Sequence, residues 1–185
     1  AIKNSDIVIN LIGILFENRK QKFTNIHSEL PGLIAKHCSE SEVKKFIHVS
    51  AIGANANSKS LYQQSKFAGE QKALNNFRNT IIIRPSVVCG TEDNFTNLFA
   101  KLSIAPIIPV VKTSYNFQPI LVNDVVKAIV KAIEVKKNEG KIYEIGGPKV
   151  IGFGNMVKSI LNTIGKKRFV IRSTYANCKN TSEFI

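Results

Sequence analysis

The sequence predicts an α/β protein whose core is part of a doubly wound parallel sheet. Short apolar runs rich in β-branched residues alternate with amphipathic stretches along most of the chain, which is the pattern of βαβ units. The apolar runs are continuous rather than alternating, as expected of strands that are buried on both faces. The connections between the first three runs are long enough to hold a helix each, so these strands should be parallel.

The first half of the chain contains three predicted strands joined by two predicted helices. The strands are expected at residues 6–12, 45–50 and 80–84, and the helices at residues 24–37 and 61–77. Pro85 stops the third strand, because proline has no N–H to donate to a sheet. Pro31 and Gly32 lie at the centre of the first helix, where neither residue favours helical structure.

The second half of the chain has a looser pattern after Gly90. Its expected elements are a short helix over 93–102, a proline-punctuated segment over 104–111, an extended piece over 116–122, a helix over 125–137, a strand over 141–145, a helix over 154–164 and a strand over 168–171. Asn123 or Asp124 can cap the 125–137 helix, and Gly140 ends it.

The composition gives a formal net charge of +13, from 26 Lys and Arg against 13 Asp and Glu. Of these cations 21 are Lys, and they are scattered along the chain rather than gathered in one run. Ile and Asn, which share A/T-rich codons with Lys, are also frequent, so genome composition accounts for much of the excess. The charge therefore indicates a solvated basic face first, an anionic partner or peripheral membrane surface second, and a nucleic-acid partner last.

The sequence also excludes several classes of protein. No apolar run approaches the roughly 20 residues that a membrane helix needs, since Asn10 interrupts residues 7–16 and two prolines interrupt residues 104–111. A secretory signal is not expected, because Asp6 precedes the first run and no small-residue cleavage site follows it. The cysteines fit a reducing compartment without disulfides or a zinc site, because they are far apart and in no CxxC spacing; they are Cys38, Cys89 and Cys178.

Tyr62 and Lys66 form a Tyr-x-x-x-Lys spacing on the predicted 61–77 helix. Four residues make about one turn, so the ammonium lies beside the phenol, where its charge is expected to lower the pKa of the phenol. Ser50 stands at the carboxyl end of the preceding strand, the edge at which open α/β sheets bind ligands. Tyr175 and Lys179 have the same spacing but lie in a tail without this context.

These residues resemble the Ser-Tyr-Lys triad of the short-chain dehydrogenases/reductases, in the extended or atypical branch that includes NAD-dependent epimerases and dehydratases. Further segments resemble the same family, namely DIVINLIG (6–13), IIIRPSVVCG (81–90), QPILVNDVVKAI (118–129) and KIYEIGGP (141–148). Within this family, FIHVSAIGANANSKSLYQQSKFAGE and RPSVVCGTEDNFTNLFA are similar to the 39 kDa accessory subunits of respiratory complex I and their bacterial relatives.

The resemblance implies a Rossmann-type protein that binds NAD(H) or NADP(H). It implies that Ser50 orients a carbonyl or hydroxyl, that Tyr62 is the acid or base, and that Lys66 also hydrogen-bonds the nicotinamide ribose. The other residues expected beside the cofactor are Gly13, Pro85, Ser86, Val87 and Val88. Residues 1–90 would be the C-terminal half of the nucleotide-binding domain, residues 91–172 a smaller substrate-side region interwoven with it, and residues 173–185 a frayed tail.

The remaining reactive side chains are expected to be structural. His27, His37 and His48 are too dispersed for a metal site, and His48 falls within a predicted strand. Cys89 is expected to be a small buried residue. Arg84 either pairs with a carboxylate near the cofactor or has a structural role.

The family's opening strand and GxxGxxG turn, which bind the cofactor pyrophosphate, are missing from the sequence. The resemblance starts at the family's fourth strand, so we expect a fragment that binds the cofactor weakly or not at all. Residues 6–12 would then form a sheet edge, which predicts pairing with a separate N-terminal fragment or a homodimer through this strand.

Three functions stay open on the sequence alone. The first is an NAD(P)-binding, reductase-like accessory subunit that contacts other complex I subunits and holds a structural nucleotide. The second is a reductase, epimerase or dehydratase that acts through the triad on a sugar-nucleotide, isoprenoid or quinone-like substrate. The third is a non-functional remnant or a basic interaction module. The expected location is the bacterial cytoplasm, including the inner face of the plasma membrane, or the matrix side of a mitochondrion.

Overall fold

The structure, a computed structural model, describes residues 2–111, 116–135 and 140–173. Its contacts divide the chain into two compact units, one made of residues 1–85 and 123–145 and the other of residues 86–122 and 146–185. The chain therefore crosses between the units three times. The tail predicted to fray lies outside the described residues, apart from Ser173.

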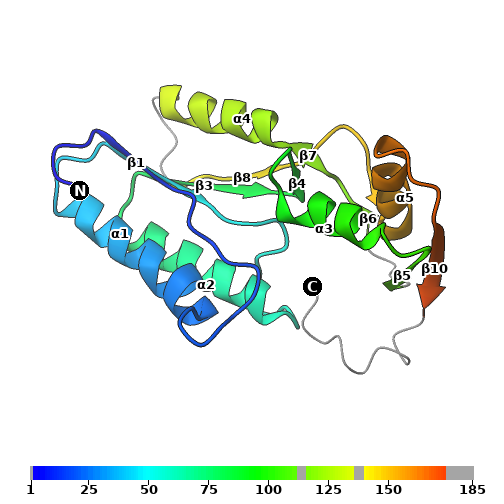
Figure 1. The fold of residues 1–185 in the computed structure, drawn as a ribbon. Helices are drawn as coiled ribbons and strands as arrows, with labels where there is room; N and C mark the ends of the chain where they lie inside the picture. The colour runs from blue at the N-terminus through cyan, green and yellow to red at the C-terminus, as the bar shows by residue number, and fades with distance from the viewer. Residues whose placement is uncertain (1, 112–115, 136–139, 174–185) are drawn as a thin grey trace. The chain divides into compact units, whose positions relative to one another are not determined.

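The first unit is built on a four-stranded parallel sheet in the order β1-β2-β3-β8. The strands are β1 (Ile7–Asn10), β2 (Lys45–Val49), β3 (Thr80–Pro85) and β8 (Ile142–Ile145). Helices α1 (Leu30–Ser39) and α2 (Leu61–Asn76) lie on one face of the sheet and α4 (Val122–Glu134) lies on the other (Figure 1). The predicted parallel pairing of the first three strands is confirmed, and so is the doubly wound arrangement.

The two middle strands form the core of this unit, as their continuous apolar runs predicted. Their fully buried side chains include Phe46, Ile47, Ile81 and Ile82. On the α1 and α2 face, Ala35, Cys38 and Ala73 pack in one cluster with Phe46. Among the described strands β1 lies at the edge of the sheet, and its Ile9 is 40% exposed.

The helix predicted over 24–37 begins at the expected residue but is made of two pieces. Thr24–Glu29 form a π-helical segment, η1, and α1 continues from Leu30. Pro31 lies in the first turn of α1. The backbone of η1 lies directly against α2, because a Cβ at Gly69 would be 1.8 Å from the carbonyl oxygen of His27.

The buried Lys45 ties α4 to the sheet. Its Nζ donates to the backbone carbonyls of Ala132, Ile133 and Val135, at 2.9, 2.5 and 2.8 Å. Carbonyls at the end of a helix have no partner within the helix, and a cation there is favourable. Together with the pairing of β8 with β3, this contact places residues 123–145 in the first unit, whereas the sequence analysis grouped them with the substrate-side region.

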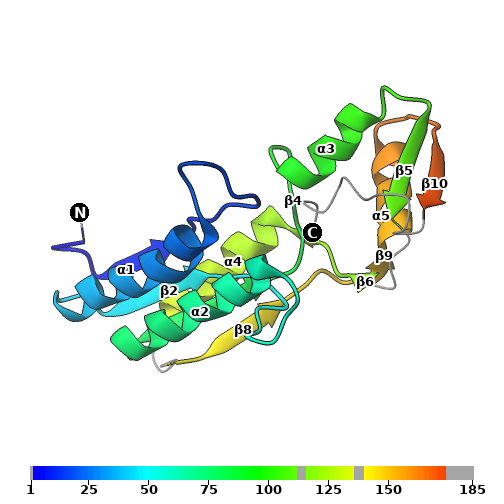
Figure 2. The ribbon, with the colours of Figure 1, turned by 90° about the horizontal axis from the view of Figure 1, so that it is seen from below.

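The described part of the second unit contains two helices and three pairs of short strands. Its elements are β4 (Val88–Cys89), α3 (Asn94–Leu102), β5 (Ile107–Val111), β6 (Asn116–Phe117), β7 (Ile120–Leu121), β9 (Ile151–Gly152), α5 (Phe153–Thr163) and β10 (Phe169–Ser173). The pairs are β5 with β10, β4 with β7 and β6 with β9. Helix α5 packs beside β5 and β10 around a core that includes Phe99, Ile108 and Val157 (Figure 2).

Candidate functional site

The carboxyl ends of β1 and β2 and the first turns of α2 carry the predicted site residues of the first unit. Asn10 ends β1, and Gly13 lies in the loop that follows. Ser50 directly follows β2, and Tyr62 and Lys66 lie one turn apart on α2. This is the edge of a parallel sheet at which ligands are bound in open α/β folds.

Lys66 is the buried cation of this site. It is 5% exposed, and its Nζ lies 5.9 Å from the centre of the Tyr62 ring. Gly13 packs onto it, since a Cβ at Gly13 would be 3.2 Å from Lys66 Nζ. Burial lowers the pKa of Lys66 to about 8, although the negative charge of Glu70 acts in the opposite direction. The buried ammonium therefore lies beside the half-buried phenol ring, as their spacing predicted.

The effect on the Tyr62 phenol is the opposite of the expected one. Burial raises the pKa of Tyr62 above its ordinary value of 10.0. Desolvation disfavours the charged phenolate, and the ammonium of Lys66 lies over the face of the ring. The Tyr62 phenol therefore stays protonated at pH 7.

Two buried polar atoms of this sheet edge, Ser50 Oγ and His48 Nε2, have no hydrogen-bond partner among the described residues. The amide of Asn10 is oriented by its Oδ1, which accepts from the Ile12 N–H at 3.0 Å. Its Nδ2 lies 3.1 Å from His48 Nδ1, which must accept, so the ring proton of His48 is on Nε2. A buried hydroxyl and a buried N–H at this sheet edge are therefore left without a partner among the described residues.

His27 lies in η1 and contacts the same site, since a Cβ at Gly13 would be 3.7 Å from its Nε2. Its Nε2 accepts from the Ile14 N–H at 3.0 Å, and its Nδ1 lies 3.1 Å from Ser65 Oγ. Its ring meets the Tyr62 ring edge-on, with 5.1 Å between the centroids. Burial, helped by the positive charge of Lys66, lowers the pKa of His27 to about 4. Sequence spacing gave no sign of this arrangement, because its partners are 13 and 38 residues away.

Glu70, one turn beyond Lys66, is fully buried and pairs with Arg84 of β3. Arg84 donates from Nε to Oε1 at 2.9 Å and from Nη2 to Oε2 at 2.6 Å. Its Nη1 donates to Glu144 Oε1 of β8 at 3.1 Å. These carboxylates raise the pKa of Arg84. Arg84 thus pairs with two carboxylates, of which Glu70 was not singled out from the sequence.

The predicted nicotinamide segment, residues 85–88, begins at the end of β3. The Pro85 carbonyl accepts from the Ile52 N–H at 3.0 Å. The following residues belong to the second unit, where Ser86 Oγ accepts from the Gln118 N–H and the Val87 carbonyl accepts from the Ile120 N–H. Val88 pairs with Ile120 in the β4–β7 ladder. These bonds fix the backbone of the segment, and its role toward a nicotinamide stays a prediction.

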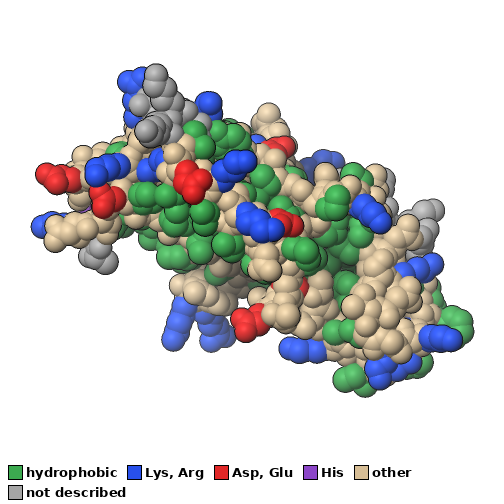
Figure 3. All heavy atoms as spheres, turned by 90° about the horizontal axis from the view of Figure 1, so that it is seen from above, with side chains coloured by type: hydrophobic (Ala, Val, Ile, Leu, Met, Phe, Trp, Pro, Cys, Tyr) green, Lys and Arg blue, Asp and Glu red, His purple; other side chains and the backbone are tan. Residues whose placement is uncertain are grey.

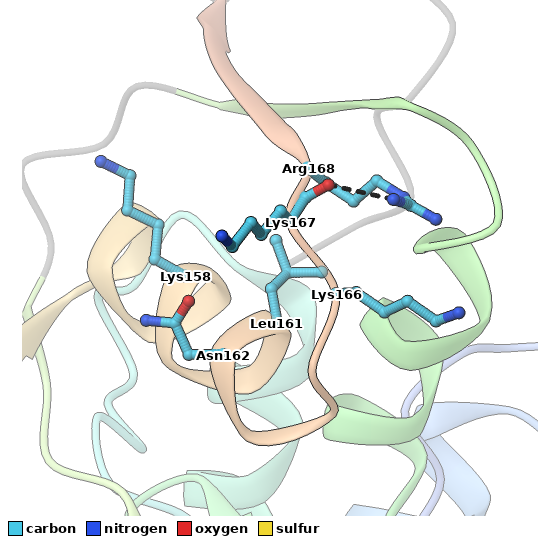
Figure 4. Close-up of a pocket in the computed structure, with 6 residues that line it drawn as sticks. All are labelled: Lys158, Leu161, Asn162, Lys166, Lys167 and Arg168. Carbon is cyan, nitrogen blue, oxygen red and sulfur yellow. Dashed lines mark hydrogen bonds between the residues drawn. The ribbon is translucent and has the colours of Figure 1, made fainter.

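A hollow of about 260 Å³ lies in the second unit between α5 and the segment that leads to β10 (Figure 4). Its lining residues are Lys158, Leu161, Asn162, Lys166, Lys167 and Arg168. Lys158 and Lys167 extend to one side of Leu161, and Lys166 and Arg168 extend to the other side (Figure 4). The lining offers cations and an amide but no carboxyl, thiol, hydroxyl or imidazole group, so we assign it no catalytic role.

The other candidate sites remain without support. Among the described residues, no three His, Cys, Asp or Glu side chains are placed to hold a metal ion. Burial, and the negative charge of Asp93, raise the pKa of Cys89, which does not favour a thiolate nucleophile. Tyr175 and Lys179 lie outside the described residues.

Lys and Arg side chains are spread over the face shown in Figure 3 rather than gathered in one place. In the part of the chain that the structure describes, no helix combines the length and the apolar character needed to cross a membrane.

The fold is the Rossmann-type fold that reductases and epimerases of known structure share. A dTDP-4-dehydrorhamnose reductase from Clostridium acetobutylicum matches 95% of this chain and 68% of its own, with a TM-score of 0.83 and 17% identity. A UDP-glucuronic acid 4-epimerase from Bacillus cereus, solved with UDP-glucuronic acid and NAD, matches 91% of this chain and 62% of its own, with a TM-score of 0.74 and 20% identity. The predicted fold class is confirmed.

By sequence, the chain is related to mitochondrial subunits of the NADH:ubiquinone oxidoreductase. It is 37% identical over 162 residues to NADH dehydrogenase (ubiquinone) 1 alpha subcomplex subunit 9 of Mus musculus, which is 86% of this chain and 43% of that protein. The same subunit of Dictyostelium discoideum is 32% identical over 163 residues, 88% of this chain and 45% of that protein. The predicted resemblance to these complex I subunits is confirmed, over less than half of their length. No family model matches the chain.

Proposed function

We propose that this chain forms the nicotinamide side of an NAD(P)-binding, reductase-like subunit related to those of complex I, in which the nucleotide is a structural element. The observation that supports this best is the buried ammonium of Lys66 beside Tyr62, at a sheet edge where Ser50 Oγ and His48 Nε2 have no partner among the described residues. Buried polar atoms in native proteins are almost always paired, so a polar ligand at this edge would satisfy them.

Each side chain has a separate task in this proposal. Lys66 donates to the ribose hydroxyls of NAD(H) or NADP(H), Ser50 hydrogen-bonds a carbonyl or hydroxyl, and Tyr62 holds a proton next to it. Gly13 leaves room at Lys66 that any larger residue would fill. The backbone of residues 85–88 borders the nicotinamide amide. A bound nicotinamide would supply the capacity for hydride transfer.

The pyrophosphate end of the cofactor has no matching motif in these 185 residues, because their glycines form no GxxGxxG turn. The N–H groups of such a turn, at a helix N-terminus, hold the phosphates in dinucleotide-binding folds. We therefore expect weak binding by the chain alone. Binding should strengthen when the missing strands are supplied as a separate fragment that pairs with the edge of β1, and a homodimer through β1 is the competing arrangement.

Nucleotide binding by the whole chain tests this proposal. Saturation-transfer NMR with NADPH and NADH should detect a weak complex, which Lys66→Met removes. Lys72→Met, which removes a partly exposed lysine from the same helix, should leave the signal unchanged. No transfer to the wild-type chain, or equal transfer to the Lys66→Met variant, would contradict the site. Submicromolar affinity in calorimetry would contradict the weakness expected without the glycine turn.

Assembly with complex I subunits is proposed from the sequence relatives, which are mitochondrial subunits of that enzyme. The corresponding location is the matrix side of a mitochondrion or the cytoplasmic face of a bacterial plasma membrane. A tagged chain should comigrate with NADH dehydrogenase activity on a native gel of its source membranes. Migration only as the free chain would contradict this part of the proposal.

A second function, catalysis by a reductase, epimerase or dehydratase, is favoured by one observation. Ser50, Tyr62 and Lys66 are all present at one sheet edge, and the lowered pKa of Lys66 suits proton exchange near neutral pH. Tyr62→Phe separates the two functions. It should reduce reductase turnover by about 10²–10⁴-fold, whereas comigration with complex I should survive it.

A further inference from the structure

His27 contacts three parts of the first unit. It lies in η1, accepts from the Ile14 N–H of the loop after β1, and contacts Ser65 of α2. The same loop contains Gly13, which packs onto Lys66 Nζ. One buried side chain, 1% exposed, thus connects the Gly13 loop with the helix that carries Tyr62 and Lys66.

The hydrogen bonds of His27 determine its tautomer. The tautomer in turn determines which partner donates in each bond. A backbone N–H can only donate, so Nε2 is the acceptor for Ile14 and the proton of the neutral ring is on Nδ1. That proton is donated to Ser65 Oγ at 3.1 Å. Ser65 in turn donates its own proton to the Tyr62 carbonyl oxygen at 2.8 Å. The chain of bonds therefore runs from the Gly13 loop through His27 and Ser65 to the backbone of Tyr62.

The ring of His27 also restrains the ring of Tyr62. Phe23 stacks on His27 with 5.0 Å between the centroids, and it meets Tyr62 edge-on at 5.8 Å. His27 meets Tyr62 edge-on at 5.1 Å. The phenol ring therefore has two neighbouring rings that limit its rotation, while Lys66 lies over its face.

We propose that His27 is a positioning residue for Tyr62 and the Gly13 loop, and that it does this only as the neutral Nδ1–H tautomer. The inference rests on the function proposed above, since Tyr62 and Lys66 are the groups it positions. Protonation of Nε2 would remove the acceptor of the Ile14 N–H and put a second positive charge beside Lys66. The lowered pKa of His27 is consistent with a ring that stays neutral.

The wild-type chain gives the first test, which needs no nucleotide. Two-dimensional ¹H–¹⁵N NMR of the histidine rings should show His27 as the Nδ1–H tautomer, without a titration step between pH 5 and pH 8. An Nε2–H tautomer, or a titration midpoint near the ordinary pKa of about 6.5, would overturn the inference.

Variants of His27 give the second test. His27→Ala removes both hydrogen bonds and should weaken NADPH binding about tenfold, which is about 1.4 kcal/mol. It should also lower the pKa of the Tyr62 phenol toward 10, because water reaches the ring. This pKa is measured by titrating the tyrosine absorbance and subtracting the titration of the Tyr62→Phe variant. His27→Gln keeps an acceptor within reach of Ile14 and His27→Asn keeps a donor for Ser65, so each should restore part of both effects.

A matched control for His27→Ala is available in the same unit, and the outcomes distinguish the role of His27 from the proposed function. His37→Ala removes an exposed histidine of α1 and should change neither quantity. If NADPH does not bind to the wild-type chain, the proposed function fails, and the tautomer and the Tyr62 pKa still decide the role of His27. If NADPH binds and His27→Ala alters only the melting temperature, the positioning role is overturned. If His27→Ala does not fold, the Gln and Asn variants provide the comparison.

Discussion

Glu70 keeps a charge in the core of the first unit by accepting two hydrogen bonds from Arg84. The pair links α2 to β3 one turn beyond Lys66, so it also fixes the rotation of the helix that points Lys66 into the site. A buried carboxylate is costly unless it is paired with good geometry, and a fork-shaped contact with arginine provides that geometry.

Glu70→Gln should therefore lower the free energy of unfolding by about 2–4 kcal/mol, because Arg84 keeps its charge and loses its buried partner. Glu144→Gln removes the exposed partner of the same arginine and should cost less than about 1 kcal/mol. Urea denaturation followed by circular dichroism measures both values. An equal loss from the two variants would show that burial does not decide the strength of this pair.

Helix α2 is placed against η1 by Gly69, where a methyl group would be 1.8 Å from the His27 carbonyl oxygen. Gly69→Ala should destabilise the chain by about 3 kcal/mol or more, since backbone on both sides must move apart. This is opposite to the gain of about 1 kcal/mol that alanine brings to an exposed helix position. The hydrogen-exchange rates of the η1 amides should also increase in the Gly69→Ala variant.

Gln71→Ala, a partly exposed position on the same helix, is the control for Gly69→Ala. It should change stability by less than about 0.5 kcal/mol. If Gly69→Ala is as stable as this control, α2 and η1 are not in backbone contact in solution.

The strands and helices could be predicted from the sequence where a run is long enough to show its period. The three apolar runs that became β1, β2 and β3 are in this group. β4 and β9 were not predicted, because two residues show no alternation. The break between η1 and α1 was not predicted either, since both pieces present apolar residues with similar spacing.

Some residues of the candidate site could likewise be predicted from the sequence, and others could not. Tyr62, Lys66 and Ser50 could be found because their positions follow from one helical turn and one strand end. His27 could not be found, because its role depends on a partner 38 residues away. The direction of the Tyr62 pKa was wrong because a spacing shows that a charge is near but not how much water is excluded.

At the scale of the whole molecule, the fold buries two histidines at one edge of the sheet. Both imidazole rings are in the neutral form there. The pKa of His27 is lowered to about 4 and that of His48 to about 3, mainly by burial and further by Lys66. In the unfolded chain both rings return to the ordinary pKa of about 6.5. Below pH 6.5 the unfolded chain therefore binds protons that the folded chain does not, and stability must fall as the pH falls.

Stability should thus decrease steadily as the pH falls from about 6.5 toward pH 4. The limiting slope for two protons is about 2.7 kcal/mol per pH unit. Asp6 and Asp93, whose pKa values are lowered below 3.8, add to the loss only below about pH 5, so the slope between pH 6.5 and about pH 5 reports the histidines. Urea midpoints at half-unit steps of pH measure the slope. The double variant His27→Gln/His48→Gln should flatten it, whereas the exposed His37→Gln should not, and a wild-type midpoint that is constant down to pH 5 would mean that these rings are not buried in solution.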